Sequence, residues 1–454
     1  MALADLKAPP DSVAPAAAAI DRLDDALVTG FGRLSSAHLE GLAALQRAFA
    51  ATPLGGELAT AIQSLARSEF VDRHFLVLAA ARCALQGAMH DALLAQAAAA
   101  LGRPAPTIEA IAPAANQAAA PQVAVWMESA RQWLMELALA GFANLDVAVI
   151  LPFQATLDAI EGEPALARHA ALLAGLMGEL LEVFPTRGTP EVPRLRWADL
   201  WSRAMVLAAA PPEPLATRPV SGELRVLGTD LRAHDTFATL VVHGVLREAG
   251  AKEPRLVRAF LSTFKVDVID GDELGALFAD IGATLLGALA GGNLLTLKGM
   301  AMAGNGDLVW DDAKASAGAK ASLVADAAAA LASAPAARPT LFPADRHPAL
   351  IEELVWLAGA DYAKAMPLPI ERMAECDELG AADLPGSKGM VALLRFDGGR
   401  WSLQPIAVDK GKGSPRMVGQ GLAAGAKKAG RGSSLAILKE RASKLLRQLP
   451  GRKS

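Results

Sequence analysis

The sequence predicts a multidomain α+β protein with a mostly helical N-terminal region, a small β-rich central domain and a C-terminal module of a β-hairpin and a basic helix. Its 454 residues exceed one ordinary core and fit about two to four domains. Apolar residues recur every three or four positions up to residue 210, and the pattern becomes strand-like at Ser221. We expect four segments, comprising residues 1–210, 218–315, 316–385 and 388–454.

Residues 1–210 carry the pattern of packed amphipathic helices. Within 123–142, for example, one helical face collects Val123, Trp126, Ala130, Trp133 and Leu137. Alanine is abundant and favours helix. No fixed repeat period is visible, so a solenoid of helical repeats is not supported. A cluster of prolines marks the end of the region: Pro211, Pro212, Pro214 and Pro219.

Residues 221–312 predict the order strand, strand, strand, helix, strand, strand. The first three strands are expected within 223–231, 236–248 and 255–269, and the helix over 272–292. The last two strands form a hairpin, because Gly304-Asn305-Gly306 between apolar runs favours a tight turn. This order is that of an OB-fold, a small five-stranded and partly open β-barrel, although other small α+β domains share it.

The apolar stretch 281–297 is the best candidate for a membrane span. It lies between Asp280 and Lys298 and contains four glycines. A span needs about 20 apolar residues, so this stretch is short. We therefore expect a buried helix that runs into a strand, and no integral membrane association.

The last third of the chain mixes helical and extended patterns. Two helices are expected, over 313–334 and 350–365, with a proline-containing linker at 335–348. The run 391–408 reads as a hairpin that turns at Asp397-Gly398-Gly399. Glycine, lysine and serine then dominate 410–433, which predicts a flexible loop. An amphipathic helix with a leucine face is expected over 434–449.

The C-terminal end is strongly basic. Residues 405–454 contain twelve Lys or Arg against two acidic residues, a net charge of +10. Since the whole chain carries −4, residues 1–404 carry −14. Such an end can bind an anionic partner or the acidic body of the chain itself.

No catalytic, cofactor or zinc signature is present in the sequence. The seven histidines form no HExxH pair, and Cys83 and Cys376 have no metal-like spacing. The GxGxxG, GxxxxGK[ST] and GxSxG patterns are all absent. The N-terminus lacks the basic and apolar stretches of a secretory signal. We predict a cytoplasmic protein that is not an enzyme and needs no cofactor.

An acidic cluster allows one metal-binding alternative. Asp267, Asp270, Asp272 and Glu273 stand where a strand leads into the predicted helix. Several carboxylates can hold a divalent cation. Acidic residues at a helix start equally serve as N-caps and complement the helix dipole, and we favour that interpretation.

Basic residues in two regions are candidate contacts for an anionic partner. Arg258 and Lys265 can line a groove on the central strands, although charges also suit any solvated sheet face. Nearby phenylalanines are expected in the core: Phe237, Phe260 and Phe264. The tail candidates are Lys410, Lys412, Arg416, Lys427, Lys428, Arg431, Lys439, Arg441, Lys444 and Arg447. The tail has no aromatic residue after Trp401 for base stacking, which favours a protein partner or the chain's own body over nucleic acid or an anionic membrane.

Two stretches, 221–248 and 393–408, resemble a group of bacterial proteins of uncharacterised function. These are encoded beside MoxR-type AAA+ ATPases, von Willebrand A proteins and SWIM zinc-finger proteins. The two stretches comprise 28 and 16 of the 454 residues. The resemblance includes no catalytic motif and transfers no functional residue. It implies an accessory component of an ATPase-driven assembly.

The sequence therefore predicts a non-catalytic interaction or scaffold protein of a multiprotein assembly. The resemblance implies that this assembly is bacterial and that the protein is an accessory partner of an AAA+ ATPase. The second hypothesis is an OB-type nucleic-acid-binding protein that uses Arg258, Lys265 and the basic tail. A metal-dependent enzyme centred on 267–273 ranks last.

Overall fold

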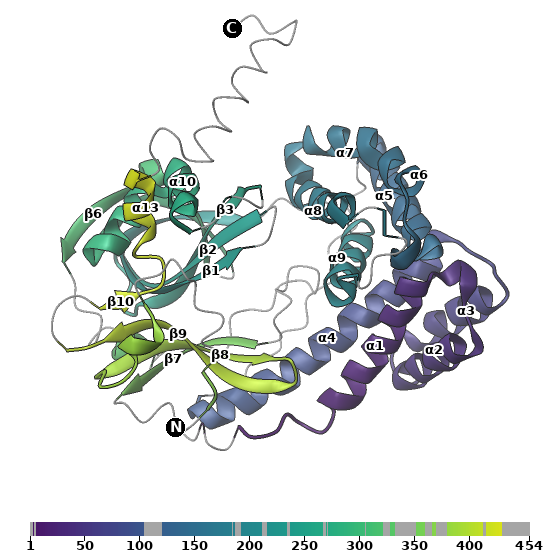
Figure 1. The fold of residues 1–454 in the computed structure, drawn as a ribbon, viewed down its shortest axis with the longest axis horizontal. Helices are drawn as coiled ribbons and strands as arrows, with labels where there is room; N and C mark the ends of the chain where they lie inside the picture. The colour runs from purple at the N-terminus through teal and green to yellow at the C-terminus, as the bar shows by residue number, and fades with distance from the viewer. Residues whose placement is uncertain are drawn as a thin grey trace, which may run out of the picture.

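The computed structural model places three bodies in contact: a helical body, a central body around a six-stranded sheet, and a C-terminal body around a four-stranded sheet (Figure 1). It describes residue 3 and residues 6–428 except 104–119, 184, 187–191, 211–215, 234–236, 267–268, 270, 305, 321–326, 332–350, 359–365, 369–378 and 412–414. The α+β class and the helical N-terminal region are confirmed.

Nine α-helices form the described part of the helical body. Gly102, in the left-handed conformation, ends the longest of them, and Pro121 occupies the first turn of the next. The helices are α1 (Val13–Thr29), α2 (Ser36–Phe49), α3 (Gly55–Ala66), α4 (Asp72–Leu101), α5 (Pro121–Ala140), α6 (Val147–Ile150), α7 (Gln154–Glu161), α8 (Ala167–Val183) and α9 (Arg194–Leu207).

The same turn occurs twice in this body, after α1 and after α5. Each helix ends at a glycine, Gly30 with φ 99° or Gly141 with φ 84°, and a phenylalanine in a short 3-10 turn follows. The turns touch, because a Cβ on Gly30 would lie 2.6 Å from the Ala140 carbonyl oxygen. Both positions therefore require glycine. The pattern Gly-Phe-x-x-Leu recurs in the sequence at both places, although no fixed period links them.

A buried ion pair joins three helices of this body. Arg82 on α4 donates from Nε to Asp24 Oδ1 on α1 at 2.8 Å and from Nη2 to Asp24 Oδ2 at 3.0 Å. Its Nη1 donates to Ser202 Oγ on α9 at 3.2 Å. The pairing compensates both charges inside the core, where a lone charge would be costly.

The central body is built on six strands and one long helix that is kinked at Gly282. β1 (Thr217–Ala233), β2 (Phe237–Glu248) and β3 (Arg255–Phe264) form an antiparallel meander. α10 (Gly271–Gly291) then leads to β4 (Asn293–Ala303), β5 (Asp307–Val309) and β6 (Ala315–Lys320).

The pairing of these strands runs in a circuit. β3 pairs in parallel with β5, β5 pairs with β4, and β4 pairs with β1 as well as with β6. The succession β1–β2–β3–β5–β4 therefore returns to β1. The long β1 has a register shift between Val226 and Gly228, where Ile406 packs against the strand. A Cβ at Gly228 would lie 2.7 Å from Ile406 Cγ1.

α10 supplies much of the central core. Leu274, Phe278, Leu285 and Leu289 are buried against the sheet, and the helix also packs on α13 (Leu422–Lys428). Among the described residues, the 19 residues Glu273–Gly291 are the one helical stretch long and apolar enough to cross a membrane. Their share in the core agrees with the predicted buried helix that runs into a strand.

The C-terminal sheet has the order β10-β9-β8-β7 and is antiparallel throughout. Its strands are β7 (Ile351–Ala358), β8 (Gly389–Asp397), β9 (Arg400–Asp409) and β10 (Arg416–Met417). Val391 and Leu393 join the central core, whereas Met390 and Leu394 pack with Leu93 of α4. The sheet thus packs against both other bodies, and α4 extends to it from the helical body (Figure 1).

Three expectations for the last third of the chain are wrong. The helix expected over 350–365 begins as strand β7, because Glu352 and Glu353 are held by arginines of neighbouring elements. Part of the helix expected over 313–334 is strand β6, which pairs with β4. The segment 410–433, expected to be a flexible loop, contains β10 and α13. The hairpin at Asp397-Gly398-Gly399 is confirmed as β8–β9.

Candidate partner-binding surface

The outer face of β3 presents aromatic side chains to solvent. Along the strand, Val257, Ala259 and Leu261 are buried, so the residues between them point outward. The outward row is Arg258, Phe260, Ser262 and Phe264. Phe264 is 72% exposed and Phe260 is 37% exposed, although apolar side chains of this size are usually inside. We call this row and its neighbours described below the β3 face.

Neighbouring strands hold the two phenyl rings in place. The Phe264 ring meets the ring of Phe237, its partner on β2, edge to face with the centroids 5.5 Å apart. Between the two phenylalanines of β3, Ser262 Oγ lies 3.1 Å from Thr239 Oγ1 on β2. The rings therefore sit on a regular two-stranded ladder, which fixes their spacing.

Arg258 is held at one end of the row. Its guanidinium lies 5.3 Å from the centroid of the Phe260 ring, and its Nε and Nη2 donate to Asp307 of β5 at 2.8 and 3.0 Å. Asp307 offsets the arginine charge. The neutral pair leaves the β3 face more apolar than its sequence suggests.

Two exposed valines extend the apolar area. Val309 is the last residue of β5 and is 47% exposed, and Val266 follows the end of β3 and is 46% exposed.

The expectation that Phe260 and Phe264 lie in the core is wrong, because both are exposed, and Phe237 is half-buried. The signal available in the sequence was the alternation of 257–264, in which both phenylalanines share a face with Arg258.

Of the predicted basic residues that the structure describes, Arg258 and Lys265 lie at the β3 face, whereas those of the tail do not. Lys265 follows β3 directly, and its Nζ donates to the Val266 carbonyl at 3.4 Å. Lys410 and Arg416 belong to the C-terminal body, where both approach Asp383 Oδ1, at 2.7 and 3.9 Å. Burial would raise the pKa of Asp383, but the hydrogen bond from Lys410 brings it below its usual value.

The remaining basic candidates lie largely outside the described structure. Lys427 and Lys428 belong to α13, but their side chains are not described. The helix expected over 434–449 lies outside the described residues. So do the other basic candidates, which are Lys412, Arg431, Lys439, Arg441, Lys444 and Arg447. Where the tail is described, its cations pair with the chain's own carboxylate.

The acidic cluster gives no metal site within the described chain. Asp267 and Asp270 are outside the described residues, Asp272 lies in the first turn of α10, and Glu273 is half-buried. In the parts of the chain that the structure covers, no group of three His, Cys, Asp or Glu residues is placed to hold a metal ion.

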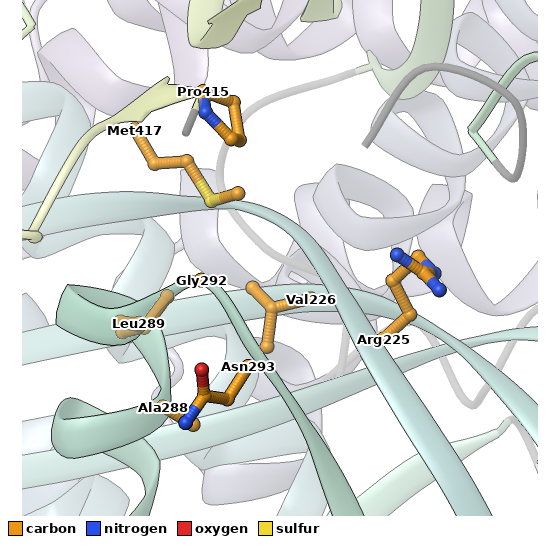
Figure 2. Close-up of a pocket in the computed structure, with 8 residues that line it drawn as sticks. All are labelled: Arg225, Val226, Ala288, Leu289, Gly292, Asn293, Pro415 and Met417. Atoms are coloured by element: carbon orange, nitrogen blue, oxygen red, sulfur yellow. The ribbon is translucent and has the colours of Figure 1, made fainter. Parts of the chain in front are cut away.

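The hollow drawn in Figure 2 is small and mostly apolar. Its volume is about 310 Å³ including the part open to solvent, and Arg225 is the one charged side chain among its eight lining residues. Met417 and Pro415 of the C-terminal segment lie over Leu289 and Asn293, at the junction of α10 and β4 (Figure 2). The hollow is therefore a seam between packed segments and lacks the convergent polar groups of a small-molecule site.

Comparisons with known proteins do not assign the chain to a family. No family model, no curated protein and no solved structure matches the chain. The bacterial resemblance drawn from the sequence therefore stays a prediction.

Proposed function

We propose that the protein is a non-catalytic interaction protein, a scaffold component of a bacterial multiprotein assembly, and that it contacts a protein partner through the β3 face. One observation carries this proposal: Phe264, on a regular strand, exposes 72% of its area to solvent on a face that also exposes Phe260, Val266 and Val309. Exposed apolar patches of this kind mark contact surfaces, because leaving them in water forfeits favourable burial.

The strand circuit supports an OB-like barrel as the platform of this face. Its features are the return of the pairings to β1, the parallel β3–β5 pair and the helix between β3 and β4. OB barrels bind their ligands on the face of strands 2 and 3. The β3 face occupies the equivalent position, which supports its assignment as the contact surface.

The junctions between the bodies support a scaffold that keeps its shape. Arg395 of β8 donates to Asp230 Oδ2 of β1 and to Glu352 Oε1 of β7, each at 2.6 Å. Arg103, after α4, donates to Glu353 Oε2 of β7 at 2.9 Å. Ion pairs of this kind hold the β3 face in one orientation relative to the helical body.

A cytoplasmic location is also part of the proposal. The role as an accessory partner of an AAA+ ATPase is part of it too, and rests on the sequence resemblance alone.

One observation favours nucleic acid as a second candidate. Bases stack on exposed aromatic rings in OB-type proteins, and Arg258 over Phe260 adds a cation to such a platform. Against it, Asp307 offsets that cation, and residues 1–404 carry a charge of −14. Binding of single strands would weaken steeply with salt, whereas an apolar protein contact would not.

The proposal is tested by affinity purification of the full chain from its native cell, with and without nuclease. We expect a specific protein to co-purify with the wild type and to be lost from the double variant Phe260→Ser, Phe264→Ser. Leu195→Ser is the matched control, because Leu195 is an equally apolar, 60% exposed residue on α9. Equal recovery of the same partners by all three proteins would contradict the proposal, and a nuclease-sensitive partner set would favour the second candidate.

A further inference from the structure

One edge of β3 is open along the exposed aromatic row. On one side, β3 pairs with β2 over its whole length, from Arg255 to Phe264. On the other side, β5 pairs only with Arg258 and Ala259, and it ends at Val309. Within the described structure, residues 260–264 therefore have a strand partner on one side only, and an open edge exposes backbone donors and acceptors.

The residues of this edge lack the sequence features that normally protect an exposed strand, although α10 packs on the inner side of β3 at Leu261. Proteins guard sheet edges with charged residues, prolines or bulges. Residues 259–264 contain no charge and no proline, and the β2–β3 register runs without a bulge. By contrast, the outer strand β7 is guarded, because Arg103 Nη2 donates to the Leu354 carbonyl at 2.7 Å.

Resting on the function proposed above, we propose that the partner supplies an extended segment that adds to β3 as a strand, in the place that β5 leaves after Val309. Backbone hydrogen bonds to 260–264 provide part of the affinity, and alternate apolar side chains of the segment cover Phe260 and Phe264. An acidic residue follows the apolar positions on the Phe264 side, because the basic Lys265 comes directly after Phe264.

The charges around β3 and in the tail favour this occupant over two others. A nucleic acid needs cations along its backbone, and no basic residue lies between Arg258 and Lys265. The chain's own tail is disfavoured too, because residues 405–454 carry +10 and the residue that follows Phe264 is the basic Lys265. An acidic-flanked apolar strand from another protein meets both conditions.

The probe is a phage-displayed library of random peptides of about twelve residues, selected on the full chain. We expect selected sequences with alternating apolar residues and a flanking Asp or Glu. A synthetic copy of the best peptide is then titrated by fluorescence anisotropy against the wild type, Phe264→Ser, Ser262→Lys and the control Leu195→Ser. Affinity should fall about tenfold or more for the first two variants and stay unchanged for the control.

Peptides N-methylated at alternate positions isolate the backbone contribution. One peptide is methylated at the residues whose backbone amides point toward β3. It loses these hydrogen-bond donors and should bind about tenfold more weakly or worse. The other peptide is methylated at the intervening residues, whose amides point away from β3, and it should bind like the parent. If both methylated peptides bind like the parent while Phe264→Ser still weakens binding, strand addition is wrong and the β3 face stands as a contact surface. If Phe264→Ser and Leu195→Ser bind equally well, the face itself is wrong.

Two further outcomes also count against the inference. Failure to select any peptide would overturn strand addition. So would Phe264-dependent binding of an oligothymidylate of about twenty residues, which would favour the nucleic-acid candidate. Circular dichroism and thermal melts of each variant check that the fold is kept. Because Phe264 and Ser262 are exposed, we expect no large change in melting temperature.

Discussion

At the scale of single residues, the orientation of two phenylalanines matters more than their identity. Phe260 and Phe264 were expected in the core because phenylalanine is usually buried, yet the strand alternation places them outside. The sequence could show that they share a face with Arg258. It could not show which face the core covers, because that depends on how distant strands pack.

His169 on α8 should make stability depend on pH. It is 4% exposed, and burial lowers the pKa of its imidazole, although its Nε2 lies 3.1 Å from the Leu207 carbonyl oxygen. An unfolded histidine titrates near about 6.5, so the unfolded state binds the proton more readily and stability falls as the pH drops below that value. Urea unfolding between about pH 5 and 8 should show this decline in the wild type and a smaller one in His169→Gln. Parallel curves for the two proteins would contradict it.

At the scale of elements, sequence patterns predicted the strands and helix whose period is clear. β2, β3, α10 and the β8–β9 hairpin lie close to their expected places, because alternation, apolar run length and the Asp-Gly-Gly turn act locally. β7 was mistaken for a helix because its Glu, Leu and Ala favour helix locally. Its pairing with β8 and the arginines that reach Glu352 and Glu353 override that preference.

The segment that carries β10 and α13 is anchored in the central body. Thr229 Oγ1 of β1 donates to the Val418 carbonyl, and Gln420 Oε1 accepts from Met417 N at 3.0 Å while its Nε2 donates to the Pro415 carbonyl at 3.0 Å. Leu422, at the start of α13, is 3% exposed within the central core.

Leu422→Ala should therefore destabilise the protein by about 2–5 kcal/mol, the usual cost of removing a buried leucine side chain. Ala424→Ser, at an exposed position of the same helix, is the control and should leave the urea midpoint nearly unchanged. Equal midpoints for the two variants would mean that α13 does not contribute to the central core.

At the scale of the whole molecule, buried charges join bodies that the sequence presented as separate. Asp230 of β1 lies between Arg395 of β8 and Arg232, and Gln404 Nε2 of β9 donates to its Oδ1 at 2.8 Å. Burial alone would raise the pKa of Asp230, but the two arginines bring it below its usual value. No local pattern identifies Arg395 and Gln404 as partners of Asp230, because both are distant from it in sequence.

Arg395→Ala should lower the free energy of unfolding by about 3–5 kcal/mol, because it leaves Asp230 and Glu352 buried at the junction of the central and C-terminal sheets with one remaining arginine. Urea unfolding followed by tryptophan fluorescence measures the loss. Arg247→Ala removes the same charge at an exposed position and serves as the control. A loss no larger than that of the control would show that the junction does not depend on this ion pair.

The most direct test of the central claim is photo-crosslinking in the native cell from Ser262, which lies between the two exposed phenylalanines. A photoreactive amino acid replaces Ser262 in one protein and Leu195 in the control, and the crosslinked products are identified by mass spectrometry. Contact of a protein partner with the β3 face predicts one defined protein adduct from position 262 and none from position 195. An adduct with nucleic acid from position 262, or the same adducts from both positions, would contradict the claim.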